Sequence, residues 1–151
     1  MERILDWNKY LDTAAKMVSE GIVMLKNDNN ALPIDTDKEV AVFGRIQFHY
    51  YKSGTGSGGM VNVTKVVNIL DGLIDNGVKV NEKLLDTYRK WDKENPFDLG
   101  EGWGGEPWSQ KEMPLDEGLV KETAKSCETA IVIIGRTAGE EQDNRLEAGS
   151  Y

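Results

Sequence analysis

Ionisable side chains are densest immediately after the last apolar stretch of the 151-residue sequence. Residues 130–134 are all apolar, and the segment that follows carries Glu140, Glu141 and Asp143 between two arginines. Open α/β sheets bind ligands outside the carboxyl ends of their strands. A carboxyl group held half-buried there can have a raised pKa and serve as a general acid. The spacing predicts this role for Glu140 or Glu141 without choosing between them, and a solvated, salt-bridged loop is the alternative.

The glycine-rich run Gly54-Thr55-Gly56-Ser57-Gly58-Gly59 is a second candidate site. It satisfies G-x-G-x-x-G, but that fingerprint requires a strand that turns directly into a helix holding a pyrophosphate. Here the preceding strand is expected to end near Phe43 and the next helix to begin near Thr64, and no phosphate-binding lysine follows. We therefore expect either a structural loop or one whose backbone N–H groups approach a polar ligand, with Ser57 as the best-placed side chain.

The remaining residues that can do chemistry are few. Trp103 and Trp108 lie in a segment rich in glycine and proline, where exposed indole faces could stack on a sugar. Trp7 and Trp91 fall on apolar helix stripes and are expected in the core. The single histidine, His49, and the single cysteine, Cys127, provide no metal-ligand set, so we expect no metal and no cofactor.

The apolar periodicity predicts alternating strands and helices. We expect helices over residues 4–26, from Thr64 to Asn76, from Asn81 through Trp91, and from Asp116 to Cys127, and strands over residues 40–43, 78–80 and 130–134. Residues 94–115 are expected to be irregular. This alternation is typical of a parallel sheet with right-handed crossovers. The fold class is therefore an α/β sandwich, flavodoxin-like and three-layered. It is incomplete, because about three strands are fewer than the roughly four to six of a typical sheet.

Composition excludes several classes of partner. The formal net charge of −8 at pH 7 and the scattered basic residues argue against nucleic acid. No apolar run approaches the length of a membrane span, and the first residues do not resemble a secretory signal. A lone cysteine favours a reducing compartment, and we expect a cytoplasmic protein.

Four segments together resemble a known family. Residues 14–34, residues 40–44, the glycine-rich run and the closing sequence Gly-Glu-Glu-Gln-Asp-Asn-Arg at 139–145 are similar, in order, to the second domain of glycoside hydrolase family 3. The resemblance is closest to the bacterial β-glucosidases. It implies that an α/β sandwich supplies the general acid/base from a loop, whereas a separate (β/α)₈ barrel supplies an aspartate nucleophile. Aligned with the family's motif, the acid/base falls on Glu140, and Glu141 occupies the position of a usual glycine.

The resemblance also implies a reaction and a set of contacts. The reaction is retaining hydrolysis of terminal β-linked glucosyl residues, which needs two carboxyl groups about 5–5.5 Å apart. Ser57, with Gly56 and Gly58, would lie near the sugar, and Trp103 or Trp108 on the side of the leaving group. Residues 1–151 would then be a partial sandwich domain that is inactive alone.

The expected partners follow from that partial domain. They are the β-glucoside, the barrel and the rest of the sandwich. The early start of the sandwich suggests a member with reversed domain order. The open edge of strand 130–134 predicts possible self-association. The alternative function is a small-ligand module that binds a nucleotide or a sugar without catalysis.

Overall fold

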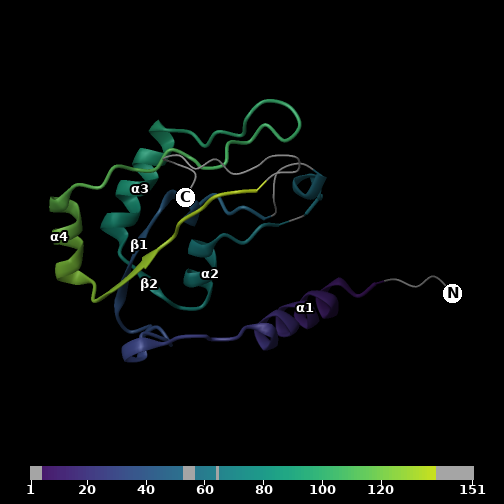
Figure 1. Ribbon diagram of the computed structural model, residues 1–151. Coiled ribbons are helices and arrows are strands. Elements are labelled where there is room, and N and C mark those ends of the chain that lie inside the picture. The colour runs from purple at the N-terminus through teal and green to yellow at the C-terminus, as the bar shows by residue number, and fades with distance from the viewer. Residues whose placement is uncertain (1–4, 53–56, 64, 139–151) are drawn as a thin grey trace. The chain divides into compact units, whose positions relative to one another are not determined.

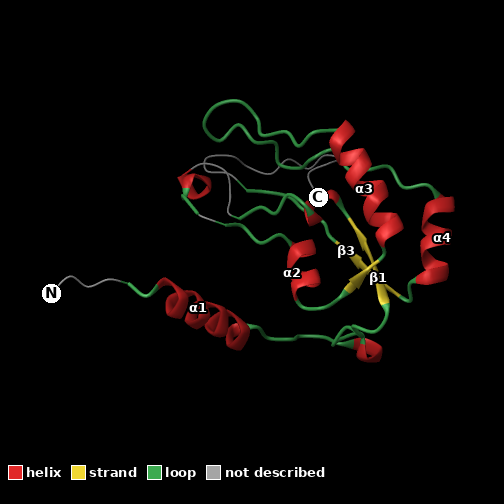
Figure 2. Ribbon diagram, turned by 180° about the vertical axis from the view of Figure 1, so that it is seen from behind, coloured by secondary structure: helices red, strands yellow, loops and turns green. Residues whose placement is uncertain are grey.

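The computed structural model describes residues 5–52, 57–63 and 65–138, in two compact units that comprise residues 1–34 and 35–151. Figures 1 and 2 together label their helices and strands. None of the described helices is both long and apolar enough to cross a bilayer.

The described part of the first unit contains one α-helix, α1 (Trp7–Gly21). Its N-terminus is capped by Asp6, whose carboxylate accepts a hydrogen bond from the Lys9 backbone N at 3.1 Å. The helix ends before the predicted position because Gly21 and the β-branched Ile22 both disfavour helix, and Ile22 is extended (φ −75°, ψ 125°). None of the residues of α1 is buried, so the expectation that Trp7 lies in a core is wrong; its exposed fraction is 64%.

The second unit is built on a parallel sheet, as predicted. Its strands are β1 (Glu39–Phe43), β2 (Lys79–Val80) and β3 (Thr129–Val132), in the order β2-β1-β3. The register pairs Val40 with Val80 on one side of β1 and Phe43 with Val132 on the other. β1 is therefore the central strand of the described sheet.

Within its described residues, the second unit contains three α-helices, α2 (Ile69–Asp75), α3 (Glu82–Glu94) and α4 (Glu117–Ser126). Asn81 and Asp116 cap α3 and α4 as predicted, each accepting a hydrogen bond from a backbone N–H of the first turn. α2 begins later than predicted: its cap is Asn68, which accepts from the Asp71 backbone N at 2.7 Å. The preceding run of β-branched valines disfavours helix, whereas asparagine is among the best capping residues. Thr64 itself lies outside the described residues.

The helices cover both faces of the sheet. α3 and α4 lie on one face, whereas α2 lies on the other, as the two opposite views show (Figures 1 and 2). One cluster of the buried core lies between β1 and the first of these layers and consists of Ala41, Phe43, Leu84, Tyr88, Met113 and Cys127. Trp91 packs against this core, as its place on the helix stripe predicted. The three-layered α/β class predicted from the sequence is confirmed.

β3 differs from the expected buried strand. Among the described residues it pairs with β1 alone, and the exposed fractions of Val132 and Ile134 are 68% and 82%. An apolar sequence indicates a strand that can be buried, but burial of its side chains requires elements that cover the faces of the sheet. The prediction of an open edge at this strand is confirmed for the described sheet.

Candidate functional site

The sheet has a topological switch point between β1 and β3. The chain adds β2 on one side of β1 and then crosses to add β3 on the other side. In open α/β sheets, ligands bind outside the carboxyl ends of the two strands that flank such a point. The segments that follow Phe43 and Val132 are therefore the candidate functional site of the described chain.

The two strands remain in close contact just past their ends. The Ile133 backbone N donates a hydrogen bond to the Phe43 carbonyl at 2.9 Å. Gly44 follows with a φ of +107°, and a Cβ at this position would lie 2.2 Å from the Ile133 carbonyl oxygen. Only glycine satisfies both the backbone conformation and the close approach. The glycine that ends β1 thus fixes how the chain enters the site.

Arg45 is the next residue, and it is one of the largest fully buried side chains of the protein, with an exposed fraction of 1%. Its guanidinium donates hydrogen bonds to the Asp92 carboxylate (2.7 Å), the Asn95 carbonyl (2.7 Å) and the Lys111 carbonyl (2.9 Å). It also lies over the Trp91 ring, with its Cζ 4.9 Å from the ring centroid. A buried charge is tolerated when it is paired and hydrogen-bonded in this way. Arg45 therefore joins the end of β1 to the end of α3 and to the irregular segment beyond it.

Two further groups extend this network. The Glu112 carboxylate accepts hydrogen bonds from the Arg45 backbone N at 2.9 and 3.1 Å. The His49 Nε2 lies 2.8 Å from the second oxygen of Asp92, so one carboxylate holds both a guanidinium and an imidazole. These residues were not identified from the sequence. The sequence signal that could have revealed this network is a carboxylate on an apolar helix face. Asp92 falls four residues after Tyr88 and eight after Leu84, and so lies on the apolar face of α3.

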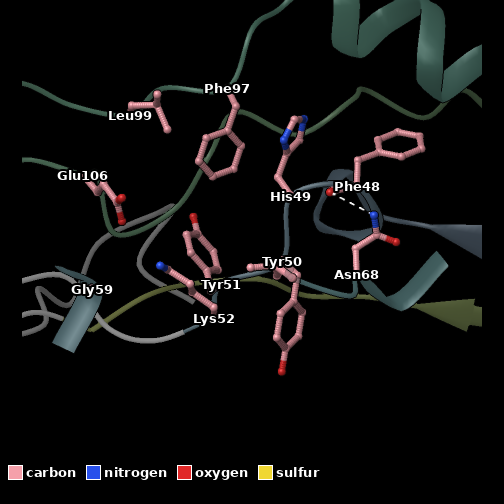
Figure 3. Close-up of a pocket in the computed structure, with 11 residues that line it drawn as sticks. Phe48, His49, Tyr50, Tyr51, Lys52, Gly59, Asn68, Phe97, Leu99 and Glu106 are labelled. Carbon is pink, nitrogen blue, oxygen red and sulfur yellow. Dashed lines mark hydrogen bonds between the residues drawn. The ribbon is translucent and has the colours of Figure 1, made fainter. Parts of the chain in front are cut away.

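A cavity of about 330 Å³ lies beside this network. It is bounded by residues 48–52, by Gly59 of the glycine-rich run and by the irregular segment (Figure 3). The Tyr51 and Phe97 rings and the Leu99 and Glu106 side chains gather around one space, whereas the Tyr50 ring points away from it. The His49 and Phe97 ring centroids are 4.7 Å apart, and those of Tyr51 and Phe97 are 5.9 Å apart. We call this space the aromatic pocket.

The electrostatics of the aromatic pocket keep Tyr51 neutral. Burial raises the pKa of Tyr51, and the carboxylate of Glu106 raises it further. The Gln110 amide lowers this pKa, although the buried Tyr51 hydroxyl completes no hydrogen bond of ordinary geometry among the described residues. The tyrosine contributes an uncharged ring to the wall at neutral pH.

The structure places the predicted site residues in three groups. Ser57 and Gly58 are exposed and lie in a 3₁₀ turn, Ser57–Met60, whose Gly59 borders the aromatic pocket. Trp103 is 61% exposed and does not border that pocket. Gly56, Glu140 and Glu141 lie outside the described residues.

Trp108 connects the irregular segment to the chain beyond β3. Its carbonyl accepts a hydrogen bond from the Thr137 backbone N at 2.9 Å, and the exposed fraction of Thr137 is only 4%. The chain that leads toward Glu140 therefore passes alongside the irregular segment. Within residues 5–52, 57–63 and 65–138, no group of three or more histidine, cysteine or carboxylate side chains could hold a metal ion.

Comparison with known proteins places this geometry in a family. Residues 22–148 match the model of the glycosyl hydrolase family 3 C-terminal domain. The chain belongs to that domain family. Among family 3 relatives, a β-glucosidase from Ruminococcus albus is 63% identical over 147 residues, which are 97% of this chain and 15% of that protein. β-Glucosidase A from Butyrivibrio fibrisolvens is 33% identical over 96% of the chain and 17% of that protein.

Solved family 3 structures show the same fold. A β-glucosidase from Paenibacillus barengoltzii superimposes with a TM-score of 0.87 at 52% identity, over 99% of this chain and 16% of that one. β-Glucosidase 3B from Thermotoga neapolitana, in complex with α-D-glucose, gives a TM-score of 0.80 at 28% identity, over 95% and 20%. The chain thus spans less than a quarter of the length of these relatives.

Proposed function

We propose that this family 3 domain supplies the general acid/base of a retaining β-glucosidase, and that the group is the Glu140 carboxyl. The observation that carries the proposal is the match to the family 3 C-terminal domain over residues 22–148, which include Glu140. Further support comes from the switch point between β1 and β3, because Glu140 follows β3 in the sequence and such sheets bind ligands outside the carboxyl ends of the strands at that point.

The proposed chemistry divides the work between this chain and the rest of the enzyme. Glu140 protonates the departing glycosidic oxygen and later takes a proton from the attacking water. The carboxylate that attacks the sugar belongs to a part of the enzyme outside these 151 residues, so the isolated chain does not hydrolyse glucosides. Ser57, Gly56 and Gly58 contact the sugar, and Trp103 contacts the leaving group.

The free edge of β3 supports the proposal that the rest of an enzyme packs against this domain. The side chains of Val132 and of Ile134 just beyond the strand are exposed, and the unpaired backbone edge of such a strand pairs readily with another strand. The relatives are more than four times as long as this chain. We propose that the remainder of such an enzyme covers this edge, and that the isolated chain self-associates through it.

A chimera tests the acid/base role. In the Ruminococcus albus β-glucosidase, the 147 matching residues are replaced by those of this chain, and hydrolysis of aryl β-glucosides is measured. We expect an active chimera, in which Glu140→Ala lowers kcat/KM by about 10²–10⁴-fold for poor leaving groups. The loss should be much smaller for dinitrophenolate, which departs without protonation.

Glu141→Ala is the matched control and should leave the rate within a few-fold of the parent chimera. If Glu141→Ala produces the large, leaving-group-dependent loss instead, the assignment to Glu140 is wrong. If neither variant changes the dependence on the leaving group, the domain does not supply the acid.

A further inference from the structure

The short stretch of chain between β3 and Glu140 is held on two sides. A Cβ at Gly135 would lie 2.1 Å from the Ile46 side chain, so the chain passes directly against the turn that follows β1. Two residues later, the Thr137 backbone N donates a hydrogen bond to the Trp108 carbonyl at 2.9 Å. The exposed fraction of Thr137 is 4%, and it is the last buried residue of the described chain. Glu140 follows it by three positions.

The partner of Thr137 belongs to residues 95–111, which we call the support segment. We propose that the support segment positions the general acid/base, and that Thr137 is the positioning residue through which it acts. Thr137 touches no reacting atom in this scheme and acts only through Glu140. The inference rests on the proposed function, because the role it assigns is defined relative to that carboxyl group.

The two ends of the support segment are fixed by one buried group. The Arg45 guanidinium donates to the Asn95 carbonyl at 2.7 Å and to the Lys111 carbonyl at 2.9 Å. The Lys111 ammonium group also donates to the Asn95 side-chain oxygen at 2.8 Å, which joins the two ends directly. Because Arg45 is buried at the end of β1, the segment begins and ends at a fixed point of the sheet.

The interior of the support segment is closed by a side-chain clamp. The Gln110 side-chain oxygen accepts from the Asp98 backbone N at 2.8 Å, and its amide nitrogen donates to the Asp98 carbonyl at 2.7 Å. Inside this clamp, Gly100 has a φ of +68°, and a Cβ there would lie 2.0 Å from the Gly105 carbonyl oxygen. Trp108 lies two residues before Gln110, so a closed loop presents its carbonyl to the chain beyond β3.

Covalent geometry carries this restraint toward the acid/base. Three residues of extended chain span at most about 11 Å, so the position of Thr137 limits where Glu140 can lie. A general acid must come within hydrogen-bond reach of the oxygen it protonates. A misplacement of about 1 Å can cost on the order of 100-fold in rate. A fixed point this close to the carboxyl group therefore favours protonation of the leaving group.

Amide hydrogen exchange on the 151-residue chain tests the link between the support segment and Thr137, independently of any catalysis. We expect Gln110→Ala to raise the exchange rate of the Thr137 amide at least tenfold, because the loop that presents the Trp108 carbonyl opens. The Ile133 amide, which is bonded to β1, should exchange as in the parent chain. Glu101→Ala, at an exposed position of the same segment, is the matched control and should change neither rate.

Kinetics of the active chimera described above test the positioning role. Thr137→Gly removes the buried side chain and frees the backbone. We expect it to lower kcat/KM about 10–100-fold for aryl β-glucosides with poor leaving groups, mostly through kcat, and only a few-fold for the dinitrophenyl glucoside. A residue required only for folding would lower both rates alike.

Two further variants separate positioning from a loss of folding. Thr137→Val keeps the branched side chain and loses a hydroxyl group that reaches the Ala138 carbonyl only at 3.5 Å, so it should retain the parent rate. Gln110→Ala leaves Thr137 intact and should show the same dependence on the leaving group to a smaller extent.

Three results would overturn the proposal. The first is an unchanged exchange rate of the Thr137 amide in Gln110→Ala. The second is a leaving-group-dependent loss for Glu140→Ala but an equal loss on both substrates for Thr137→Gly and Gln110→Ala, which would remove the positioning role and leave the proposed function standing. The third is no such dependence for Glu140→Ala, in which case the proposed function fails and the positioning role fails with it.

Discussion

The ends of β1 and β3 are built from similar sequences but have opposite environments. Each strand is apolar and leads through a glycine into an arginine, Gly44-Arg45 after β1 and Gly135-Arg136 after β3. β1 is paired on both sides and covered on both faces, and its Arg45 is almost completely buried. β3 has one strand neighbour in the described sheet, and its Val132 is mostly exposed. The comparison shows that position in the sheet, rather than local sequence, decides whether a strand end is a rigid support or an open surface.

Loss of the buried Arg45 at the end of β1 should cause the largest change in the free energy of unfolding. Arg45→Met leaves Asp92 without its guanidinium partner and should lower the free energy of unfolding by about 3 kcal/mol, the lower end for a broken buried pair because Asp92 is partly exposed. Urea unfolding followed by circular dichroism measures the change.

Arg89→Met is the matched control on α3, where the exposed arginine lies 3.3 Å from Asp86 and 3.8 Å from Glu82. It should cost less than about 0.5 kcal/mol. Equal costs for the two variants would show that the network around Arg45 does not stabilise the end of β1.

Valine-to-alanine substitutions in β1 and β3 should differ less in their effect on the free energy of unfolding than the two arginine substitutions do. Val42 in β1 is 1% exposed, so Val42→Ala removes buried methyl groups and leaves a cavity, at a cost of about 2 kcal/mol. Val132→Ala in β3 removes mostly exposed surface and should cost less than about 0.5 kcal/mol. The same unfolding experiment compares them. Both variants are compared at a dilution at which the chain is monomeric; a cost at Val132 that grows with protein concentration would show self-association through β3.

The smallest expected effect concerns the hydrogen bond at the end of β1. The Gly44 backbone N donates to the Tyr88 hydroxyl at 2.9 Å, and Tyr88→Phe should cost about 1 kcal/mol near neutral pH. Burial raises the pKa of Tyr88 above its ordinary value of 10.0. The neutral phenol therefore contributes its full stabilisation below about pH 10, and this is lost as the pH rises through the folded-state pKa.

Unfolding between pH 8 and 12 measures this dependence. The parent chain should lose stability above pH 10 more steeply than Tyr88→Phe, with Tyr51 responsible for part of the remaining slope. Identical slopes for the parent and Tyr88→Phe would contradict the role of burial at Tyr88.

Much of the fold could be predicted from local patterns. Asn81 and Asp116 precede apolar stripes at helical spacing, so the caps and the faces of α3 and α4 follow from short-range rules. The start of α2 was misplaced because Thr64 and Asn68 are both capping residues. The β-branched valines between these two residues disfavour helix, so they argued for the later start at Asn68.

The candidate site was only partly predictable for a related reason. Ser57 and Gly58 were predicted from the glycine-rich composition of their run, and the Glu140 assignment rests on a motif; both stay predictions. The aromatic pocket joins His49 and Tyr51, which lie on one segment, to Phe97, which follows more than 40 residues later in the chain. Pairing between distant residues leaves no periodic signal in a single sequence.

The sequence by itself determined the elements, because capping, periodicity and glycine content act over a few neighbouring residues. It also determined the family, through ordered motifs that cover most of the chain. Only the tertiary structure decided that Arg45 is buried and Val132 exposed, because burial depends on which strands lie next to each other. The same long-range pairing placed Asp92 between Arg45 and His49 and so formed the wall of the aromatic pocket.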